Sequence, residues 1–288
     1  MSVTLDQKIH FVTGKGGVGK SFFAASLANF LTQKEKPVLL AEINEKSFYQ
    51  DYFHIEKNIG FKPISFNNMD LSLWTGEDCL REYAQYLLKI ESLSKLFFDN
   101  PVSKALVDVA PGLKELAILG KATSLPRKHG PPLSYKHMVF DSPSTGHFLS
   151  MFRAPHALAE TIKFGPMGEQ SRSIDKWLHD SKYCHIHIVS LPEELPATET
   201  VELFRAIKKE FGLESKVYLN KYFDLNLEQL KNEPLEVGTH FVNIVEQQTT
   251  AQKILSDAGI KYTLIPLITE ADTQKLIIKA AGYLKGAV

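Results

Sequence analysis

A glycine-rich octapeptide contains the residues of this chain that are best suited to bind phosphate. It spans residues 14–21, reads GKGGVGKS and matches the pattern G-x-x-x-x-G-K-S of a P-loop. Backbone N–H groups of such a loop converge on phosphate oxygens, and the following helix directs the positive end of its dipole at them. We expect Lys20 to contact the β- and γ-phosphates and the hydroxyl group of Ser21 to ligate Mg²⁺. The motif predicts a site for a nucleoside triphosphate, with ATP and Mg²⁺ as ligands.

The other residues of the octapeptide have two kinds of role. The glycines have no side chain, so the backbone can approach the phosphates closely. Lys15 is a second lysine, directly after the first glycine, and on the pattern alone it can be a solvated loop residue. The residues of this segment that we predict to bind the nucleotide are Gly14, Gly16, Gly17, Val18, Gly19, Lys20, Ser21 and Phe22.

The segments that flank the octapeptide agree with this interpretation. Residues 9–13 are mostly apolar, as in a buried parallel strand. Large apolar residues recur at helical spacing after the loop, namely Phe23, Leu27, Phe30 and Leu31. Strand, glycine-rich loop and helix follow in the order that the motif requires, which disfavours a glycine-rich turn without a ligand.

A second candidate segment begins at Asp141, which ends the apolar run 138–140. In a P-loop fold, an aspartate at this place lies beside the phosphate loop and holds Mg²⁺, often through water. Residues 142–147 follow and read SPSTGH, in which Gly146 lets the backbone approach a γ-phosphate. Loss of γ-phosphate contacts on hydrolysis is the usual way in which such a loop changes conformation. For His147, packing and a phosphate-linked role are equally compatible with the sequence.

The elements that must position these residues alternate between strands and helices. Apolar runs typical of strands occur at residues 9–13, 38–42, 137–141, 185–190, 216–219 and 262–265. The alternation predicts one P-loop NTPase domain over residues 1–288, with a doubly wound, mainly parallel α/β sheet. The connection before residue 137 is too long for one crossover helix, and helical patterns such as 77–89 predict an inserted helical subdomain over residues 77–125. Residues 126–132 are predicted to form a loop whose two basic residues are solvated.

Composition excludes several classes of protein. The 288 residues include 33 basic and 33 acidic side chains, and a formal charge of zero gives no reason to expect a nucleic-acid partner. No apolar run is long enough to span a membrane, and the first residues lack the apolar core of a signal peptide. Cys79 and Cys184 are the only cysteines and form no C-x-x-C motif. We therefore expect two packing residues in a cytoplasmic protein, not a disulfide scaffold or a paired-cysteine zinc site.

The octapeptide with Lys15, together with segment 141–147, resembles the ArsA-type ATPases. These include the arsenite-pump ATPase and the targeting factor for tail-anchored membrane proteins, and they belong with MinD and ParA to the deviant Walker A class. The switch loop of the family reads D-T-A-P-T-G-H-T, and this chain keeps its Asp, Thr, Gly and His. The T-G-H element is specific to the ArsA branch. The resemblance implies an ATP-hydrolysing homodimer in which Lys15 of each subunit reaches the phosphates of its partner.

Looser similarities extend over most of the chain. Residues 111–115 resemble the P-G-h-x-E element of the family's helical subdomain, and residues 192–200 resemble the segment after the next strand. Asn220 matches the position whose side-chain amide reads the adenine. Pro266 and Leu267 match the loop that closes over the base. The resemblance thus implies that these three residues complete the nucleotide site.

The largest departure from the family follows the second predicted strand. The family has S-T-D-P-A-H there, and its aspartate positions the attacking water, whereas this chain has Asn44. An amide can hold a water molecule but cannot accept its proton as a carboxylate can. Glu42 lies two residues earlier on the same face of the strand, where the MinD and ParA relatives carry a second acidic residue, so it could compensate in part. Glu45 is a further candidate if the loop is shifted.

These considerations give a set of predicted catalytic residues and a predicted rate. Phosphoryl transfer depends mostly on positioning and charge stabilisation, so the loss of one water-orienting group need not abolish it. The asparagine predicts slow hydrolysis, or nucleotide binding with little turnover. The residues assigned to catalysis are Lys15, Lys20, Glu42, Asn44 and Asp141. Those assigned to the metal are Ser21 and Asp141.

The partner is less well defined by the sequence. Arsenite binding in the family uses clustered cysteines, and the two separate cysteines here argue against an arsenite-pump subunit. Apolar residues between 93 and 107 could expose a surface for a client or form the core of the helical subdomain. We expect a cytoplasmic ATPase, or one at the periphery of a membrane, that binds a protein client or a membrane-associated partner. The alternatives are a nucleotide-gated scaffold without meaningful hydrolysis and a MinD- or ParA-like positioning ATPase.

Overall fold

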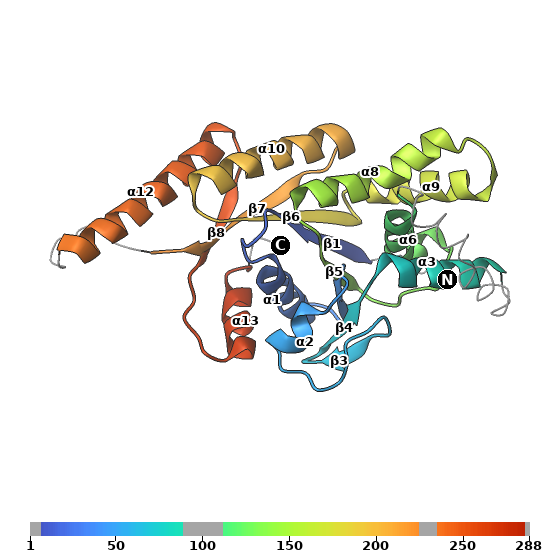
Figure 1. Cartoon of the computed structure of the whole chain (residues 1–288), viewed down its shortest axis with the longest axis horizontal. Coiled ribbons are helices and arrows are strands. Elements are labelled where there is room, and N and C mark those ends of the chain that lie inside the picture. Colours follow the sequence, from blue (N-terminus) through green and yellow to red (C-terminus); the bar gives the residue numbers. More distant parts are fainter. Residues whose placement is uncertain (1–6, 89–111, 225–234, 286–288) are drawn as a thin grey trace.

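The computed structural model describes residues 7–88, 112–224 and 235–285. Within these ranges, eight strands form one sheet in the order β3-β4-β2-β5-β1-β6-β7-β8. All neighbouring strands pair in parallel except β3 and β4, which are antiparallel. Helices α1 and α13 cover one face of the sheet, and α8, α10 and α12 cover the other (Figure 1). The predicted α/β fold, a doubly wound and mainly parallel sheet, is confirmed.

Six of the eight described strands agree with the apolar runs of the sequence, and β3 and β4 are additional. They are β1 (Lys8–Thr13), β2 (Val38–Glu42), β3 (Ile64–Phe66), β4 (Met69–Leu73), β5 (His137–Asp141), β6 (Cys184–Ser190), β7 (Ser215–Tyr222) and β8 (Tyr262–Pro266). The hairpin β3–β4 was not predicted: β3 has only three residues, and the alternating apolar residues Met69, Leu71 and Leu73 of β4 were overlooked. Its turn is formed by Asn67 and Asn68, both with positive φ (46° and 66°), a conformation that asparagine tolerates better than most residues.

The described helices pack on the two faces of the sheet or on one another. They are α1 (Lys20–Thr32), α2 (Phe48–Tyr52), α3 (Gly76–Leu88), α6 (Leu113–Ala122), α7 (Ser124–Arg127), α8 (Thr145–Thr161), α9 (Gly165–Leu178), α10 (Glu194–Phe211), α12 (Leu235–Asp257) and α13 (Thr273–Gly282). Phe23, Tyr49 and Ile277 contribute to the apolar core between α1, α2, α13 and the sheet. The core on the opposite face receives α6, α8, α10 and α12. Cys79 and Cys184 are buried in this second core as free thiols, as packing residues are.

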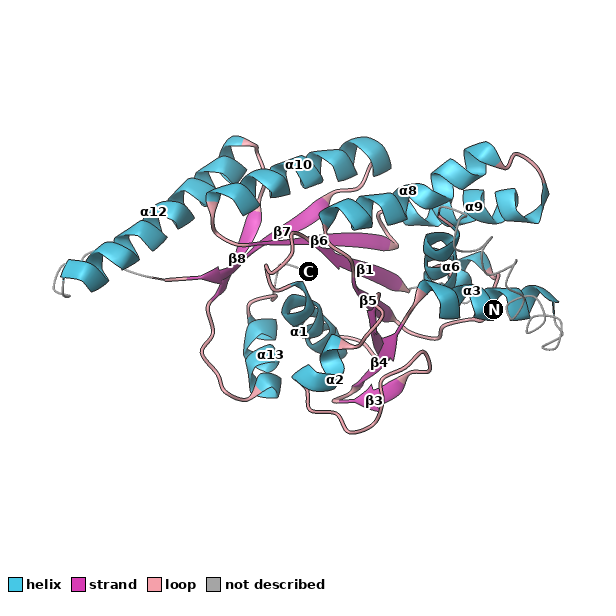
Figure 2. Cartoon of the chain, in the orientation of Figure 1, coloured by secondary structure: helices cyan, strands magenta, loops and turns pink. Residues whose placement is uncertain are grey.

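Helices α3, α6, α8 and α9 form a group at one end of the molecule, on the right of Figure 2. Helix α3 packs on α6, and α6 also packs on α8 and α9 (Figure 2). Helix α3 confirms the helical pattern predicted at residues 77–89 over its described part, residues 77–88. Gly76 permits the close approach of α3 to α6, because a Cβ atom there would lie 2.5 Å from Cβ of Lys114. The apolar residues between 93 and 107 lie outside the described residues, and the subdomain bounds 77–125 stay a prediction.

The prediction that both basic residues of segment 126–132 are solvated is wrong for Arg127. This side chain donates hydrogen bonds to the carbonyl of Gly120 (2.6 Å), to Oγ1 of Thr123 (2.9 Å) and to Gln170 of α9. Burial lowers the pKa of its guanidinium to about 10. Arg127 thus ties the end of α7 to α6 and α9, because its guanidinium donates to α6, to α9 and to Thr123, the residue between α6 and α7.

Buried histidines cross the centre of the sheet. The ring of His10 on β1 lies 3.1 Å from a ring nitrogen of His187 on β6 and 3.1 Å from a ring nitrogen of His137 on β5. His187 in turn lies 3.1 Å from the hydroxyl oxygen of Tyr218 on β7. Burial lowers the pKa of both His10 and His187 well below the usual value, and neighbouring positive charge adds to the effect. We call these four side chains the histidine row.

Candidate active site

The phosphate loop runs between the end of β1 and the start of α1 and packs against β6 and β7. Gly14 has φ +144°, and a Cβ atom there would lie 2.1 Å from the carbonyl oxygen of Val189. Gly19 has φ +92°, and a Cβ atom there would lie 2.4 Å from Nδ2 of Asn220. Both positions therefore require glycine on steric grounds that are independent of any ligand.

Asn220 supports the loop directly. Its side chain is 1% exposed, and Nδ2 donates a hydrogen bond of 2.8 Å to the carbonyl oxygen of Val18. β7 places this residue beside β6, where the loop is packed. The sequence indicated a role in adenine recognition, which remains a prediction. The structural role in holding the phosphate loop was not anticipated.

Lys20 is folded back onto its own loop. Nζ donates a hydrogen bond of 2.9 Å to the carbonyl oxygen of Lys15. Burial lowers the pKa of Lys20, and the nearby carboxylate of Asp141 opposes that shift. A phosphate oxygen is a stronger, charged acceptor than a carbonyl, so this ammonium group can move to a phosphate without loss of hydrogen bonding.

Ser21 and Asp141 lie together, as a magnesium site requires. Burial raises the pKa of Asp141, while hydrogen bonds from Ser21 and Tyr49 and the charge of Lys20 lower it. The hydroxyl and carboxylate oxygens are hard donors, the kind of ligand that Mg²⁺ prefers beside substrate phosphates. These two residues therefore fit Mg²⁺ chemically.

Glu42 and Asn44 are both engaged by the loop that follows β2. Glu42 is 2% exposed; Oε1 accepts a hydrogen bond of 2.6 Å from the backbone N–H of Phe48, and Oε2 accepts one from Ser47. Burial raises the pKa of Glu42 to about 7. Asn44 is exposed, and its Oδ1 accepts a hydrogen bond of 2.9 Å from the N–H of Glu45. Both side chains thus form hydrogen bonds with residues that follow β2, and both also line the cavity beside the phosphate loop.

A cavity of about 820 Å³ joins the phosphate loop to the helical group. Six of its lining residues are predicted site residues, namely Gly16, Lys20, Ser21, Glu42, Asn44 and Asp141. The opposite wall includes Lys114, Glu115 and Ile118 from α6, and His147 and Met151 from α8. The nucleotide side of the fold and α6 therefore share one solvent-filled space.

Lys15 lies beside this space, at a neighbouring cavity of about 460 Å³ that also contacts Gly16. Its Nζ forms an ion pair of 2.7 Å with Oε1 of Glu199 on α10. The two side chains are 40% and 35% exposed. Exposed pairs of this kind contribute about 0.2–1 kcal/mol, so the lysine is held only weakly to its own subunit.

The residues predicted to close over the base lie further along the same edge of the sheet. Pro266 ends β8 opposite Tyr222 of β7, and the N–H of Leu267 donates a hydrogen bond of 2.8 Å to the carbonyl oxygen of Tyr222. Leu267 is 41% exposed. Phe22, in the first turn of α1, is partly buried and packs against the apolar core between α1 and the sheet. Neither Pro266 nor Leu267 lines the two cavities described above.

Two residues that contact predicted site residues were not found from the sequence, Tyr49 and Ser47. Tyr49 of α2 is 1% exposed, and its hydroxyl oxygen lies 3.2 Å from Oδ2 of Asp141. The five-residue helix α2 has too short a pattern to be predicted, so nothing in the sequence indicated that this tyrosine turns inward. Ser47, which caps α2 by accepting a hydrogen bond of 3.2 Å from the N–H of Gln50, was missed for the same reason.

The fold and the arrangement of Lys20, Ser21 and Asp141 define a P-loop ATPase. The chain belongs to the anion-transporting ATPase (ArsA) family, whose family model matches residues 7–166, more than half of the 288 residues. The resemblance inferred from the two phosphate motifs is thereby confirmed, and the chain is an ATPase that binds nucleotide.

Relatives within the family differ in length and in name. The chain is 26% identical over 235 residues to ATPase BagA of Mycobacterium tuberculosis, covering 77% of this chain and 67% of that protein. It is 24% identical to the arsenical pump-driving ATPase of Acidiphilium multivorum (68% and 33% covered). It is 29% identical to the ATPase ASNA1 homolog of Plasmodium chabaudi chabaudi (54% and 38% covered). The chain thus spans less than half the length of the last two relatives.

Within the described ranges, every helix is too short or too polar to cross a lipid bilayer.

Proposed function

We propose that this ATPase is a Mg²⁺-dependent homodimeric switch of the deviant Walker A type that couples ATP binding and hydrolysis to a partner. The observation that carries the proposal is the 820 Å³ cavity, in which the phosphate loop and α6 face each other. A γ-phosphate bound at Lys20 would change the charge in a space lined by Lys114 and Glu115 of α6. The output is binding and release of a protein client or a membrane-associated partner, in the cytoplasm or at a membrane surface.

Within the site, each residue has a defined role. Lys20 and the backbone of the loop hold the phosphates, and Ser21 and Asp141 would hold Mg²⁺. Mg²⁺ held there would supply positive charge that offsets the negative charge developing during phosphoryl transfer. Asn220 keeps the loop in place and, with Pro266 and Leu267, forms the side of the site toward the base.

Hydrolysis is slow in this proposal, for a reason visible in the loop after β2. Asn44 can orient a water molecule but has no basic oxygen to take its proton. Both oxygens of Glu42 already accept hydrogen bonds from Ser47 and Phe48, so this carboxylate is only partly available as a substitute. The presence of Asn44 is also compatible with the alternative of a nucleotide-gated scaffold, in which ATP hydrolysis has no role.

Lys15 acts on the partner subunit in this proposal. In the single chain its ammonium group pairs with Glu199 at the protein surface. The partner's phosphates would offer it more negative charge in a less solvated place, which favours the exchange. A dimer that forms around ATP would therefore break the Lys15–Glu199 ion pair in both subunits.

Hydrogen–deuterium exchange tests the coupling between nucleotide and helical group. We expect the amides of α6 and of the first turn of α8 to exchange more slowly with Mg²⁺ and a non-hydrolysable ATP analogue than with Mg-ADP, because a γ-phosphate would add negative charge to the cavity that these helices line. The amides of α13, on the other face of the sheet, serve as the internal control. Equal exchange of α6 in the two nucleotide states would contradict the switch.

A further inference from the structure

Tyr49 stands at a junction of three elements of the site. It belongs to α2, and its ring is buried in the core, where it stacks on Phe53 at a centroid distance of 5.7 Å. Its hydroxyl oxygen lies 2.9 Å from the carbonyl oxygen of Ser21 on α1 and 3.2 Å from Oδ2 of Asp141 on β5. The tyrosine therefore touches both residues that the proposed function assigns to the metal.

The hydroxyl group of Tyr49 has one proton for these two acceptors. An ionised carboxylate is the stronger acceptor, and the carbonyl oxygen of Ser21 lies in the first turn of α1, where a helical N–H can satisfy it. The hydrogen bond to Asp141 is thus the one that the hydroxyl group favours when Asp141 is charged. This hydrogen bond restricts the rotation of the carboxylate and does not involve its other oxygen, Oδ1.

The helix that carries Tyr49 is itself anchored beside Asp141. Ser47 and the N–H of Phe48 at the start of α2 both donate to Glu42. Glu42 is the register partner of Asp141 on the adjacent strand. Helix α2 is thus attached to Glu42 at its start and to Asp141 through the hydroxyl group of Tyr49. These two residues are neighbours at the carboxyl ends of the adjacent strands β2 and β5.

We propose that Tyr49 is a positioning residue for the magnesium site, which orients Asp141 and ties the orientation of that carboxylate to the loop containing Asn44. The inference rests on the proposed function, in which Ser21 and Asp141 hold Mg²⁺. Tyr49 is 1% exposed and does not line the 820 Å³ cavity, so it acts through Asp141 and not on the nucleotide.

Substitution Tyr49→Phe tests this role, because it keeps the ring in the core and removes only the hydroxyl group. Mn²⁺, which electron paramagnetic resonance detects, is titrated into the protein with saturating ATP. We expect the apparent Kd for Mn²⁺ to rise about tenfold, as for other partners of metal ligands. The affinity for ATP in EDTA should stay unchanged, since the hydroxyl group does not touch the nucleotide. The matched control is Tyr52→Phe, a half-buried tyrosine on the same helix.

Three results would overturn the inference. These are an unchanged Kd for Mn²⁺ in Tyr49→Phe, an equal loss in Tyr52→Phe, and an equal loss of ATP affinity in EDTA, which would indicate general damage to the site. The proposed function fails in a different way, if the wild-type protein with ATP does not bind Mn²⁺ at all.

Discussion

At the scale of single residues, the proposed slow hydrolysis depends on Asn44 and Glu42. The resemblance to the family aligns Asn44 with a water-positioning aspartate, and in the structure its Oδ1 accepts a hydrogen bond from the neighbouring N–H of Glu45. Glu42 faces the same cavity but is held by Ser47 and Phe48. Neither side chain is poised to take a proton from water, which is why we infer slow turnover.

Substitution Asn44→Asp should therefore increase the rate of ATP cleavage. A carboxylate at this position can orient water and accept its proton, and general-base catalysis contributes on the order of 10²-fold, so we expect an increase of at least about tenfold. The measurement is a single-turnover assay with the protein in excess over ATP. The control is Asn67→Asp, the same substitution on the β3–β4 turn, which should leave the rate unchanged. No change with Asn44→Asp would mean that residue 44 does not face the attacking water.

At the scale of elements, the histidine row makes stability depend on pH. Burial lowers the pKa of His10 and His187, so the folded state keeps them neutral at pH values where the unfolded chain, with a pKa of about 6.5, takes up protons. The free energy of unfolding should thus fall as the pH falls below about 6.5. Glu42, whose pKa is raised to about 7, acts in the opposite direction, because its protonation as the pH falls favours the folded state.

Substitution His10→Gln should make this pH dependence weaker. We expect the loss of unfolding free energy between pH 7.5 and pH 5.5, measured by urea denaturation, to be about 1 kcal/mol smaller than in the wild type, since one buried titrating group is removed. The variant should also be less stable than the wild type at pH 7.5, because His187 and His137 each lose a partner. His240→Gln, on the exposed part of α12, is the control. An unchanged pH dependence in His10→Gln would contradict the role of the histidine row.

The elements also show what a single sequence can and cannot predict. Six of the eight described strands and the phosphate loop were predictable, because apolar runs and the GKGGVGKS motif are local patterns. The short helix α2 and the hairpin β3–β4 were not, because their positions depend on contacts with distant residues such as Asp141. Arg127 was misjudged for the same reason. Its acceptors come partly from Gln170 on α9, more than forty residues away.

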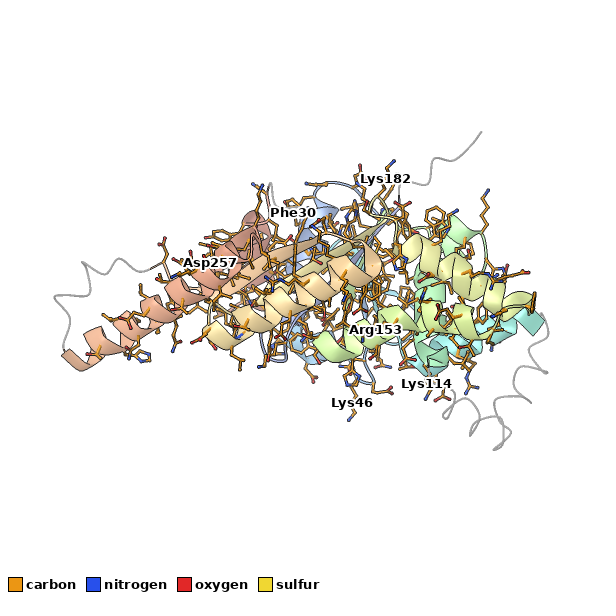
Figure 3. The ribbon with its side chains drawn as sticks, turned by 90° about the horizontal axis from the view of Figure 1, so that it is seen from above. Phe30, Lys46, Lys114, Arg153, Lys182 and Asp257 are labelled. Carbon is orange, nitrogen blue, oxygen red and sulfur yellow. The ribbon has the colours of Figure 1, made fainter. Side chains whose placement is uncertain are left out.

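At the scale of the whole molecule, we propose that ATP joins two copies of the chain. The phosphate loop, Lys15 and Glu199 lie along one side of the molecule, next to two cavities that share Gly16 and Ser144. Lys182 lies at the opposite edge from Lys46, which follows Asn44 and Glu45 in the loop after β2 (Figure 3). A lysine far from this side therefore provides a matched control for Lys15.

The most direct test is the molar mass of the protein by gel filtration with light scattering. We predict a dimer with Mg²⁺ and a non-hydrolysable ATP analogue, and a shift toward the monomer with Mg-ADP. Lys15→Ala should raise the Kd of the dimer about tenfold or more, because a phosphate in the interface loses its charged partner, whereas Lys182→Ala should behave as the wild type. A mass that is the same in both nucleotide states, or a Lys15→Ala variant that dimerises as well as the wild type, would contradict the account.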